Sequence, residues 1–463
     1  MTAKAATALL AGAGQTDITP VPGIQLAGDI GRHRPTEEVR ERLHARALVF
    51  DAGGERVCLV VLDLLATSNE WANEIRQRAA QRFGLRPEAI MLNVTQNHAA
   101  PQIGHTFVRD ECGLMPEAHP WLRGGDERYN EPAVASILDA IGQALGALRP
   151  VALSAGRGMD GRVAFNRRFV MRDGTARCHP AVCDPNILHA EGPVDPEVGV
   201  LRVAPADGAA DAPAIALLLH HTCHPTAGYP MRYVIGDWPG VWAELMQPQG
   251  GAGCVPLVVN GCCGNIHHNN HLDPAYKCDH RRNGELLAET ATRVLGKLEP
   301  LPGARVGTKR TVLRLPLRAL PPAEVAAARK LIIEHPEPMW LDAEHTRVHW
   351  DWVYAVAMLD LADARQERAT ADYEVQVFRL GDAALVGLQG EPFVEAQLRI
   401  KLESPARYTF VAHFCNGDVG YVPTRRALER GGYETRTANW SKFAPEALER
   451  IEDTALGLLR ELF

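Results

Sequence analysis

Apolar and polar positions alternate along this chain in blocks that predict strands followed by helices. Residues 57–65, VCLVVLDLL, form an almost unbroken apolar run and predict a buried strand. In 68–84, apolar residues recur every three to four positions, between Ser68 as a capping residue and Gly84 as a terminator. A second apolar run follows at 89–94. The pattern predicts a strand-helix-strand unit.

The same alternation continues through most of the chain. Further strands are predicted at 214–220, 255–260, 373–380, 383–388 and 408–412. Helices are predicted at 131–147, 284–297, 322–334, 346–366, 392–403 and 444–461. This order is typical of an α/β fold, which we expect to be a mixed β-sheet core flanked by helices.

The domain organisation has only weak signals in the sequence. Residues 301–370 are helix-rich and punctuated by proline, so we expect a helical insertion or cap there. Neither an internal repeat nor a low-complexity segment divides the 463 residues. We therefore predict either one large domain over 1–463, elaborated by that insertion, or two domains.

Composition and charge exclude several classes of partner. Hydrophobic residues make up 46% of the chain and the net charge is −7, which is ordinary for a soluble globular protein and gives no reason to expect nucleic acid as a partner. No apolar run reaches the length of a membrane span. A small-molecule substrate is the expected partner, and a homo-oligomer is left open.

Cysteine usage and the N-terminus bear on the compartment. The ten cysteines are scattered without repeating spacing, which favours free thiols in a reducing compartment. The N-terminal apolar run LLAGAG is short and broken by glycine, unlike a secretory signal. We expect a cytoplasmic protein.

Polar side chains follow five of the predicted strands at the point where each strand ends. Because ligand crevices form at the carboxyl ends of strands in α/β sheets, we expect these side chains to converge. The clusters contain Gln96 and His98, His221 and His224, the run GCCGNIHHNNH at 261–271, Glu391, and Asp418 with Tyr421.

The mixture of imidazole and carboxylate predicts a metal or acid–base site. These are ligands that zinc uses in open catalytic sites. Glu391 precedes Pro392, which suits the start of a helix and would fix the carboxylate at a strand-to-helix junction. Phosphate loops, nucleophile elbows and dinucleotide-binding glycine motifs are all missing from the sequence.

A series of short motifs resembles the neutral/alkaline, non-lysosomal ceramidase family, specifically its catalytic domain and bacterial relatives of unassigned substrate. The likeness runs through most of the chain, and it is the order and number of the motifs that are specific. They are GAGQTDITP, LHARALVFD, VVLDLLATS, NVTQNHAAP, VAFNRR, VDPEVGVLRV, CHPT, GDWPG, NGCCGN, GLQGEPF, NGDVGYVPT and GGYE.

The resemblance implies a zinc amidase in which two His, one Glu and one Tyr hold the metal and a bound water attacks the amide. It assigns metal ligation to His224, Glu391 and Tyr421. A second tyrosine, twelve residues after Tyr421, matches the family residue that steadies the tetrahedral oxyanion. That residue is Tyr433.

The first ligand motif departs from the family. Family members read Thr-His-Thr-His at this point, whereas this chain reads TQNHAAP, which places Gln96 on the ligand position and His98 beside it. A neutral amide oxygen is a poorer zinc ligand than imidazole. Either His98 takes over the coordination, or the site holds a metal weakly, or no metal binds.

The run at 261–271 is similar to a ceramidase loop that forms a wall of the site. The likeness places Asn265 where the family has Asp and His267 where it has a catalytic Ser. We expect a structural role for the adjacent Cys262 and Cys263, because they lack the spacing of a redox dithiol. A second interpretation is that a histidine of this loop supplies the ligand that Gln96 does not, and the candidates are His267, His268 and His271.

The expected substrate is a small soluble amide or ester, because the chain ends soon after the helix 444–461 and we expect no C-terminal immunoglobulin-like domain. Arg167 or Arg168 could bind a carboxylate or phosphate of the substrate, or could instead form a surface ion pair. The residues expected around the substrate are Gln96, Arg167, Asn265 and Asp418.

The leading hypothesis is a metal-dependent, zinc-type hydrolase of an amide C–N bond. His98, His224, Glu391 and Tyr421 would hold the metal, with Tyr433, His98 and His267 as catalytic residues. Two alternatives stay open at this point. One is an ester or lactone hydrolase, or a metal-free lyase, on the same scaffold. The other is a binding protein without catalysis.

Overall fold

The computed structural model describes residues 8–208 and 212–463, and within them a nine-stranded sheet forms the larger half of the core. Eight of its strands lie in the order β14 (Val255–Asn260), β12 (Ala216–His221), β11 (Glu197–Pro205), β6 (Arg149–Met159), β1 (Leu9–Asp17), β3 (His44–Ala52), β4 (Glu55–Leu62) and β5 (Ile90–Val94). The short β16 (Glu299–Leu301) pairs with β6. The pairs β4–β5 and β12–β14 are parallel, and the others are antiparallel.

A second, smaller sheet packs on the inner face of the first. Its order is β17 (Val306–Pro316), β18 (Thr370–Leu380), β19 (Ala383–Leu388) and β21 (Tyr408–Ala412), with β19 and β21 parallel. Phe50 and Leu59 from the large sheet share one hydrophobic core with Phe378 and Phe410 from the small sheet. The two sheets therefore form a sandwich.

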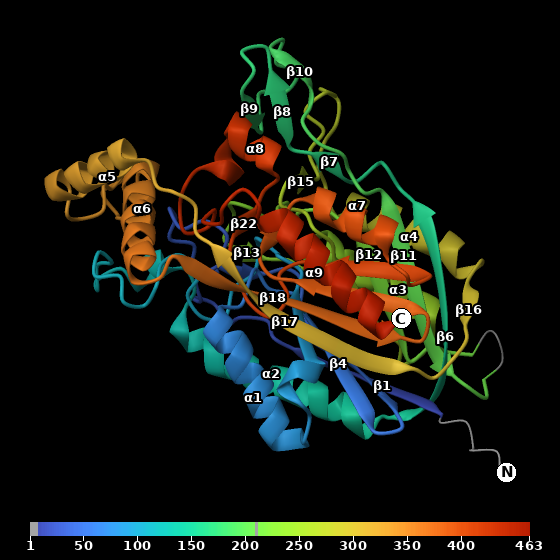
Figure 1. Ribbon diagram of the computed structural model, residues 1–463. Coiled ribbons are helices and arrows are strands. Elements are labelled where there is room, and N and C mark those ends of the chain that lie inside the picture. Colours follow the sequence, from blue (N-terminus) through green and yellow to red (C-terminus); the bar gives the residue numbers. More distant parts are fainter. Residues whose placement is uncertain (1–7, 209–211) are drawn as a thin grey trace.

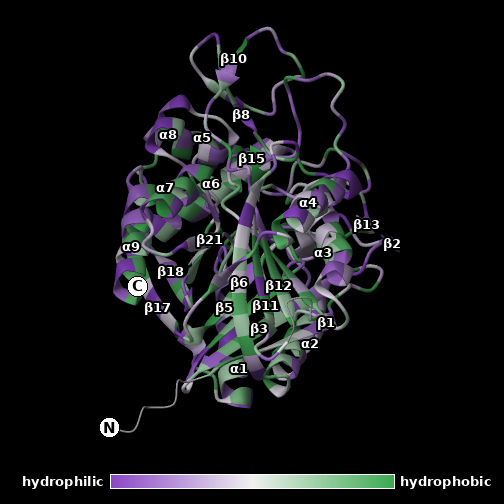
Figure 2. Ribbon diagram, turned by 90° about the vertical axis from the view of Figure 1, so that its right-hand side faces the viewer, coloured by the Kyte–Doolittle hydropathy of each residue, from purple (hydrophilic) through white to green (hydrophobic). Residues whose placement is uncertain are grey.

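Helices cover both outer faces, so the protein has four layers (Figure 1). The large sheet is covered by α1 (Asn69–Phe83), α2 (Glu127–Gly146), α3 (Asp237–Gly250) and α4 (His280–Leu295). The small sheet is covered by α7 (Val394–Glu403) and α9 (Ala447–Leu462). Figure 2 shows apolar residues concentrated on the strands and polar residues on the outer faces of the helices.

Strand β4 shows why the predicted apolar run at 57–65 is a strand. Its alternate residues Val57, Leu59 and Val61 enter the core between the sheets, while Cys58 and Val60 pack against α1 and α2. Successive side chains of a strand point to opposite faces. A strand covered on both faces therefore reads as continuously apolar.

The helices α5 (Pro322–Glu334) and α6 (Trp350–Glu367) project from the body at one side (Figure 1). They form a separate hydrophobic cluster with residues of the segment 107–122. The expected insertion at 301–370 thus contains two helices, but it also contains β17, which belongs to the small sheet. The limits of the domains stay a prediction.

Short elements complete the structure around the site. Small pairings join β2 (Glu38–Val39) with β13 (Tyr233–Val234), β7 (Phe165–Asn166) with β15 (Ile266–His267), and β20 (Glu391–Pro392) with β22 (Tyr421–Val422). The strands β8 (Arg168–Met171), β9 (Ala176–Cys178) and β10 (Ile187–Ala190) form a protruding sheet. Short helical segments lie at η1 (Pro87–Ala89), η2 (Pro120–Arg123), α8 (Arg425–Arg430) and η3 (Tyr433–Thr435).

The predicted α/β class, a mixed sheet core flanked by helices, is confirmed. The helix α3 was not predicted, because its sequence contains Pro239, Pro248 and two glycines, which lower helix propensity. Trp238 and Trp242 of this helix are fully buried against the large sheet. Packing therefore outweighs the weak local preference.

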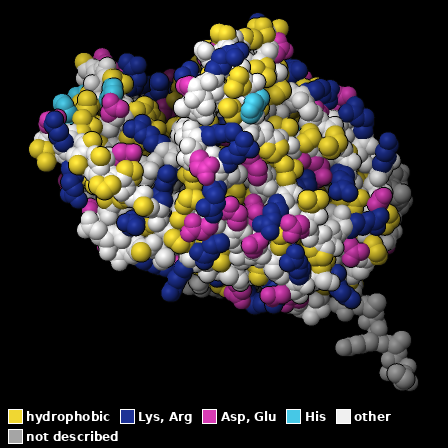
Figure 3. All heavy atoms as spheres, turned by 45° about the horizontal axis from the view of Figure 1, so that its top comes forward, with side chains coloured by type: hydrophobic (Ala, Val, Ile, Leu, Met, Phe, Trp, Pro, Cys, Tyr) yellow, Lys and Arg dark blue, Asp and Glu magenta, His cyan; other side chains and the backbone are white. Residues whose placement is uncertain are grey.

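The surface carries interspersed charges. Figure 3 shows basic and acidic side chains mixed on one face. In the described part of the chain, none of the helices is long and apolar enough to cross a lipid bilayer.

Candidate active site

The carboxyl ends of strands from both sheets meet at one point, and Asn260 holds them together. The Asn260 amide, at the end of β14, donates to the carbonyls of Thr95 after β5 and of Cys223 after β12, both at 3.0 Å. The backbone carbonyl of Asn260 accepts from the amide of His413 after β21 at 3.1 Å. One fully buried side chain thus ties together loops that are far apart in the sequence.

A pocket of about 120 Å³ opens beside this junction. Most of its wall is apolar or aromatic, with Phe107, Trp121, Trp350 and Trp440 among the lining residues. Its polar wall includes six of the residues proposed from the sequence: Gln96, His98, Glu391, Asp418, Tyr421 and Tyr433. His224 lies directly behind His98.

His98 and His224 face each other through their Nε2 atoms at 3.0 Å. The backbone of Gly28 forms a hydrogen bond with the His98 ring, and Nδ1 is the ring atom next to Gly28. The Nδ1 atom of His224 lies 3.3 Å from the Cys263 carbonyl. Because a carbonyl accepts only from N–H, both rings carry their proton on Nδ1, and both Nε2 lone pairs point at the same small space.

The two imidazoles are neutral. Burial lowers the pKa of His98 to about 3, and the nearby Arg34 and Arg167 contribute in the same direction. Burial also lowers the pKa of His224 well below its usual value. Two neutral acceptors that face each other attract a shared proton or a cation, and neutral imidazole is the form that binds metals.

Glu391 brings a buried carboxyl group to the same pocket. It lies where β19 hands over to β20 and pairs in register with Tyr421. Burial raises the pKa of Glu391 to about 8, with Arg167 opposing and Asp418 reinforcing the shift. Its Oε2 atom is buried without a hydrogen-bond partner among the described residues. An unpaired buried carboxylate oxygen is costly, which marks a position for a ligand, proton or ion.

Tyr421 is oriented by a buried arginine. Arg167 donates to the Tyr421 hydroxyl at 3.1 Å and to the Gly264 carbonyl at 2.7 Å. Its Nε lies 2.8 Å from Glu434, which also pairs with Arg168 at 2.6 Å. Burial acts to raise the pKa of Glu434, but Arg167 and Arg168 outweigh it and lower the pKa. Burial and Glu391 raise the pKa of Tyr421 well above its usual value, so it is a phenol.

Arg167 and Arg168 therefore sit in an internal ion-pair network, and neither forms a surface pair. Both are buried. Their ion-pair partners are protein carboxylates, Glu434 for both and Glu191 for Arg168, and a contact of either arginine with a substrate stays a prediction. Arg167 reaches the candidate pocket only through the hydroxyl of Tyr421.

Gln96 adopts a left-handed backbone conformation with φ 67°. Its side-chain oxygen accepts from the Cys263 thiol at 3.2 Å. Burial raises the pKa of the Cys262 and Cys263 thiols well above the usual value, so neither is a thiolate. Each of the ten cysteines is free. These contacts assign Cys263 a supporting position behind Gln96.

The remaining residues proposed from the 261–271 loop lie outside the pocket wall. His267 bonds to the Thr226 hydroxyl at 2.6 Å and packs on His179 and His268. Asn265 donates to Glu395 at 2.9 Å and accepts from the Val394 amide at 2.9 Å. Nδ1 of His268 lies 3.0 Å from the His224 carbonyl, so the loop supports the backbone at His224. Catalytic or substrate contacts by these side chains stay predictions.

Three residues that hold the site were missed from the sequence. Glu434 lies beside Tyr433 in GGYE but carries no motif of its own, and Gly28 and Asn260 are ordinary residues of a loop and a strand end. A β-carbon on Gly28 would lie 2.4 Å from Nδ1 of His98. The requirement for glycine at that position is visible only when the two chain segments meet in space.

Whether a metal ion fits this site depends on its four candidate ligands together, which are His98, His224, Glu391 and Tyr421. Among residues 8–208 and 212–463, no three His, Cys, Asp or Glu side chains are grouped closely enough to hold an ion by themselves. The His98–His224 pair supplies two converging acceptors, and Glu391 and Tyr421 line the adjoining pocket. The donor types suit zinc, provided that Tyr421 takes part or Glu391 moves toward the pair.

Comparison with known proteins identifies the fold. No family model matches the chain, and no curated protein matches its sequence. Two solved structures match with a TM-score of 0.72 and 19% identity over 98% of this chain. One is neutral ceramidase from Pseudomonas aeruginosa, with 74% of its chain covered, and the other is described as a ceramidase complexed with C2, with 76% covered. The chain therefore has the fold of neutral ceramidase.

Proposed function

We propose that this protein is a hydrolase of an amide C–N bond in a small soluble substrate of the cytoplasm, and that it works with a divalent metal ion, most simply zinc. The ceramidase fold supports an amide as the scissile bond. The observation that carries the metal is the pair of Nε2 acceptors of His98 and His224 at 3.0 Å. Glu391 and Tyr421 would complete the ligand set.

A divalent ion at this position would lower the pKa of water and polarise a carbonyl group. Glu391, held in a site that favours its protonated form, is suited to release a proton when a cation arrives and to accept one during turnover. Arg167 holds the Tyr421 hydroxyl in one orientation.

We assign to Tyr433 the role of hydrogen-bond donor to the developing oxyanion. Its ring stands edge-on to that of Tyr421, with centroids 5.9 Å apart, and it lines the pocket. Such a donor contributes typically about 3 kcal/mol to the stability of the transition state. Phe107, Trp121, Trp350 and Trp440 line the same pocket, and a wall of low polarity strengthens each polar interaction beside it.

The test combines elemental analysis with turnover of a panel of small amides and esters. We expect close to one ion per wild-type chain and amide cleavage that a chelator abolishes. Glu391→Gln keeps the size of the side chain, and we expect it to lower turnover at least about a thousandfold while the fold persists. Glu74→Gln, at an exposed position on α1, is the matched control.

Three outcomes would redirect the proposal. Turnover that resists chelation, in protein with less than about one ion in ten chains, would favour metal-free acid–base chemistry on the same scaffold. Cleavage of esters but not of amides would show that the scissile bond is an ester. Ligand-induced stabilisation without cleavage of any compound would indicate a binding protein.

A further inference from the structure

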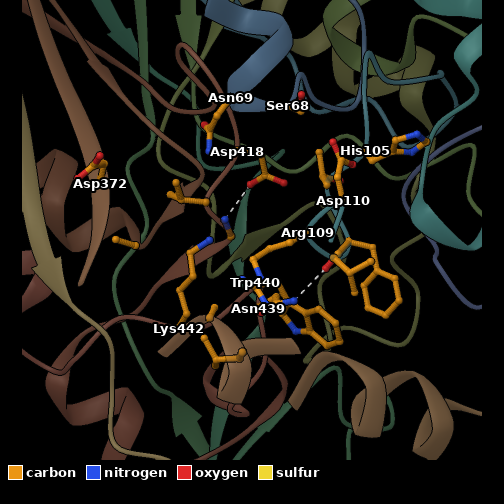
Figure 4. A pocket seen from close by; sticks show the side chains of 18 of the residues that line it. Ser68, Asn69, His105, Arg109, Asp110, Asp372, Asp418, Asn439, Trp440 and Lys442 are labelled. Carbon is orange, nitrogen blue, oxygen red and sulfur yellow. Dashed lines mark hydrogen bonds between the residues drawn. The ribbon is translucent and has the colours of Figure 1, made fainter. Parts of the chain in front are cut away.

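A second, larger cavity of about 530 Å³ adjoins the candidate pocket. The two share Thr106, Phe107, Asp418 and Trp440 in their walls. Figure 4 shows Asp418 and Trp440 in the larger cavity. The pocket itself, at about 120 Å³, is smaller than the roughly 300 Å³ from which small-molecule sites usually begin. A substrate larger than the reacting amide needs further space, and the second cavity beside Asp418 and Trp440 provides it.

Lys442 lies in the wall of this larger cavity, and Figure 4 shows its side chain extending toward Asp418. Among the described residues, Lys309, Lys330 and Lys401 form ion pairs, whereas Lys442 forms none. Burial lowers its pKa, with Asp418 acting in the opposite direction. Its ammonium group, which carries three N–H donors, lies 5.8 Å from the centre of the Phe443 ring and is available to a ligand in the cavity.

The other cations of the wall already have partners. Arg109 donates to Asp360 at 3.0 Å and to Glu367 at 2.8 Å. Arg368 donates to Asp372 at 2.5 Å. These pairs neutralise the two guanidinium groups, so Lys442 is the cation left for a ligand within the described wall.

Asp418, Asp360 and Glu70 are the carboxylates that act on Lys442, and each opposes the effect of burial on its pKa. Asp418 is turned toward its own backbone and accepts from the Gly420 amide at 2.8 Å. Glu70, Asp110 and Glu111 are exposed at the rim. Exposed charges are screened over about 8 Å at physiological salt, whereas a charge inside a cavity is screened much less.

We propose that Lys442 binds a carboxylate on the part of the substrate remote from the scissile bond. The substrate class is then an amide that carries a carboxylate, such as an N-acylated amino acid. This inference rests on the proposed amide hydrolysis for its biological meaning. The anion site itself can be tested without turnover.

The binding test uses the full chain and three five-carbon probes: glutarate, 1,5-pentanediol and 1,5-diaminopentane. Binding is measured by calorimetry and by the shift in melting temperature. We expect glutarate to bind wild type, Lys442→Arg and the surface control Lys297→Met, and to bind Lys442→Met at least tenfold more weakly. Neutral pentanediol should bind none of them. Binding of diaminopentane in place of glutarate, or equal binding of glutarate by Lys442→Met, would overturn the proposal.

The turnover test compares an N-acylated amino acid with its carboxamide. Lys442→Met should raise KM for the acid at least tenfold and leave the carboxamide unchanged. Cleavage of amides without any preference for the acid would reject the Lys442 site and leave the proposed function standing. If glutarate binding depends on Lys442 but the protein cleaves no amide, the Lys442 site stands and the proposed function is rejected. Lys442→Arg, which keeps the charge, separates a lost contact from a failure to fold.

Discussion

The thiol of Cys263 donates to the side-chain oxygen of Gln96 at 3.2 Å. The amide oxygen at the position where the ceramidase resemblance calls for a histidine ligand is thus already engaged by the protein. Coordination would then depend on the neighbouring His98, which faces His224. Gln96 is therefore the position at which the proposed metal site departs from the ceramidase pattern.

Gln96→His should raise metal affinity at least tenfold. An imidazole is a better zinc ligand than an amide oxygen. The backbone at this position is left-handed, with φ 67°, a conformation in which histidine is enriched among non-glycine residues. Isothermal titration of the metal-free protein with zinc measures the change. Gln96→Asn is the control, and an unchanged affinity in Gln96→His would argue that this position does not face the ion.

Gly28→Ala should displace the His98 ring and weaken metal binding. The added methyl group would lie 2.4 Å from Nδ1 of His98, at a backbone φ of 95°. Backbone strain alone costs about 1–3 kcal/mol. Gly54→Ala is a matched control, because Gly54 has a φ of 90° and no atom within 4 Å of the added carbon. Denaturant unfolding and zinc titration of both variants separate strain from the contact; equal zinc affinity in the two would refute the role of Gly28.

Arg167→Met should destabilise the protein by about 3 kcal/mol. Glu434 is fully buried and would keep only Arg168 as a cationic partner. Removing one member of a buried ion pair leaves an uncompensated charge. Urea unfolding gives the stability, and the kcat of the folded variant reports the loss of the Tyr421 contact. Arg167→Lys should recover part of the stability; a variant as stable as wild type would show that the network contributes little.

The protein should lose stability in acid through its buried neutral histidines. Burial lowers the pKa of His220 and His413 to about 3 each, below the usual 6.5. Below pH 6.5 these histidines bind protons in the unfolded chain but stay neutral in the folded chain. The contribution of these histidines to the free energy of unfolding is therefore complete above pH 6.5, and it is lost as the pH falls from 6.5 toward 3.

His413→Phe should remove one proton from this dependence. The slope of the unfolding free energy against pH would then fall by about 1.4 kcal/mol per pH unit within that window. The same substitution at the exposed His189 is the control. Urea unfolding at pH 4 to 7 measures the slope, and an identical slope in His413→Phe and wild type would contradict the prediction.

The α/β class and most of the long helices were predictable because local pattern determines them, whereas the long strands β1, β3, β6, β11 and β17 were not predicted. The runs at 255–260, 383–388 and 408–412 are strands with those same limits. Their apolar residues face cores on both sides, so the pattern and the tertiary environment agree. The position of Glu391 at a strand end was readable for the same reason.

Only the tertiary structure decided what these strand ends do together. It pairs Nε2 of His98 with Nε2 of His224, places Arg167 on Glu434 and Tyr421, and turns His267 away from the pocket wall. Residues up to hundreds of positions apart come within hydrogen-bond distance through the stacking of two sheets, and neither spacing nor composition encodes such contacts. Side-chain periodicity is a local property of the backbone, whereas the partner of a buried polar group is chosen by three-dimensional packing.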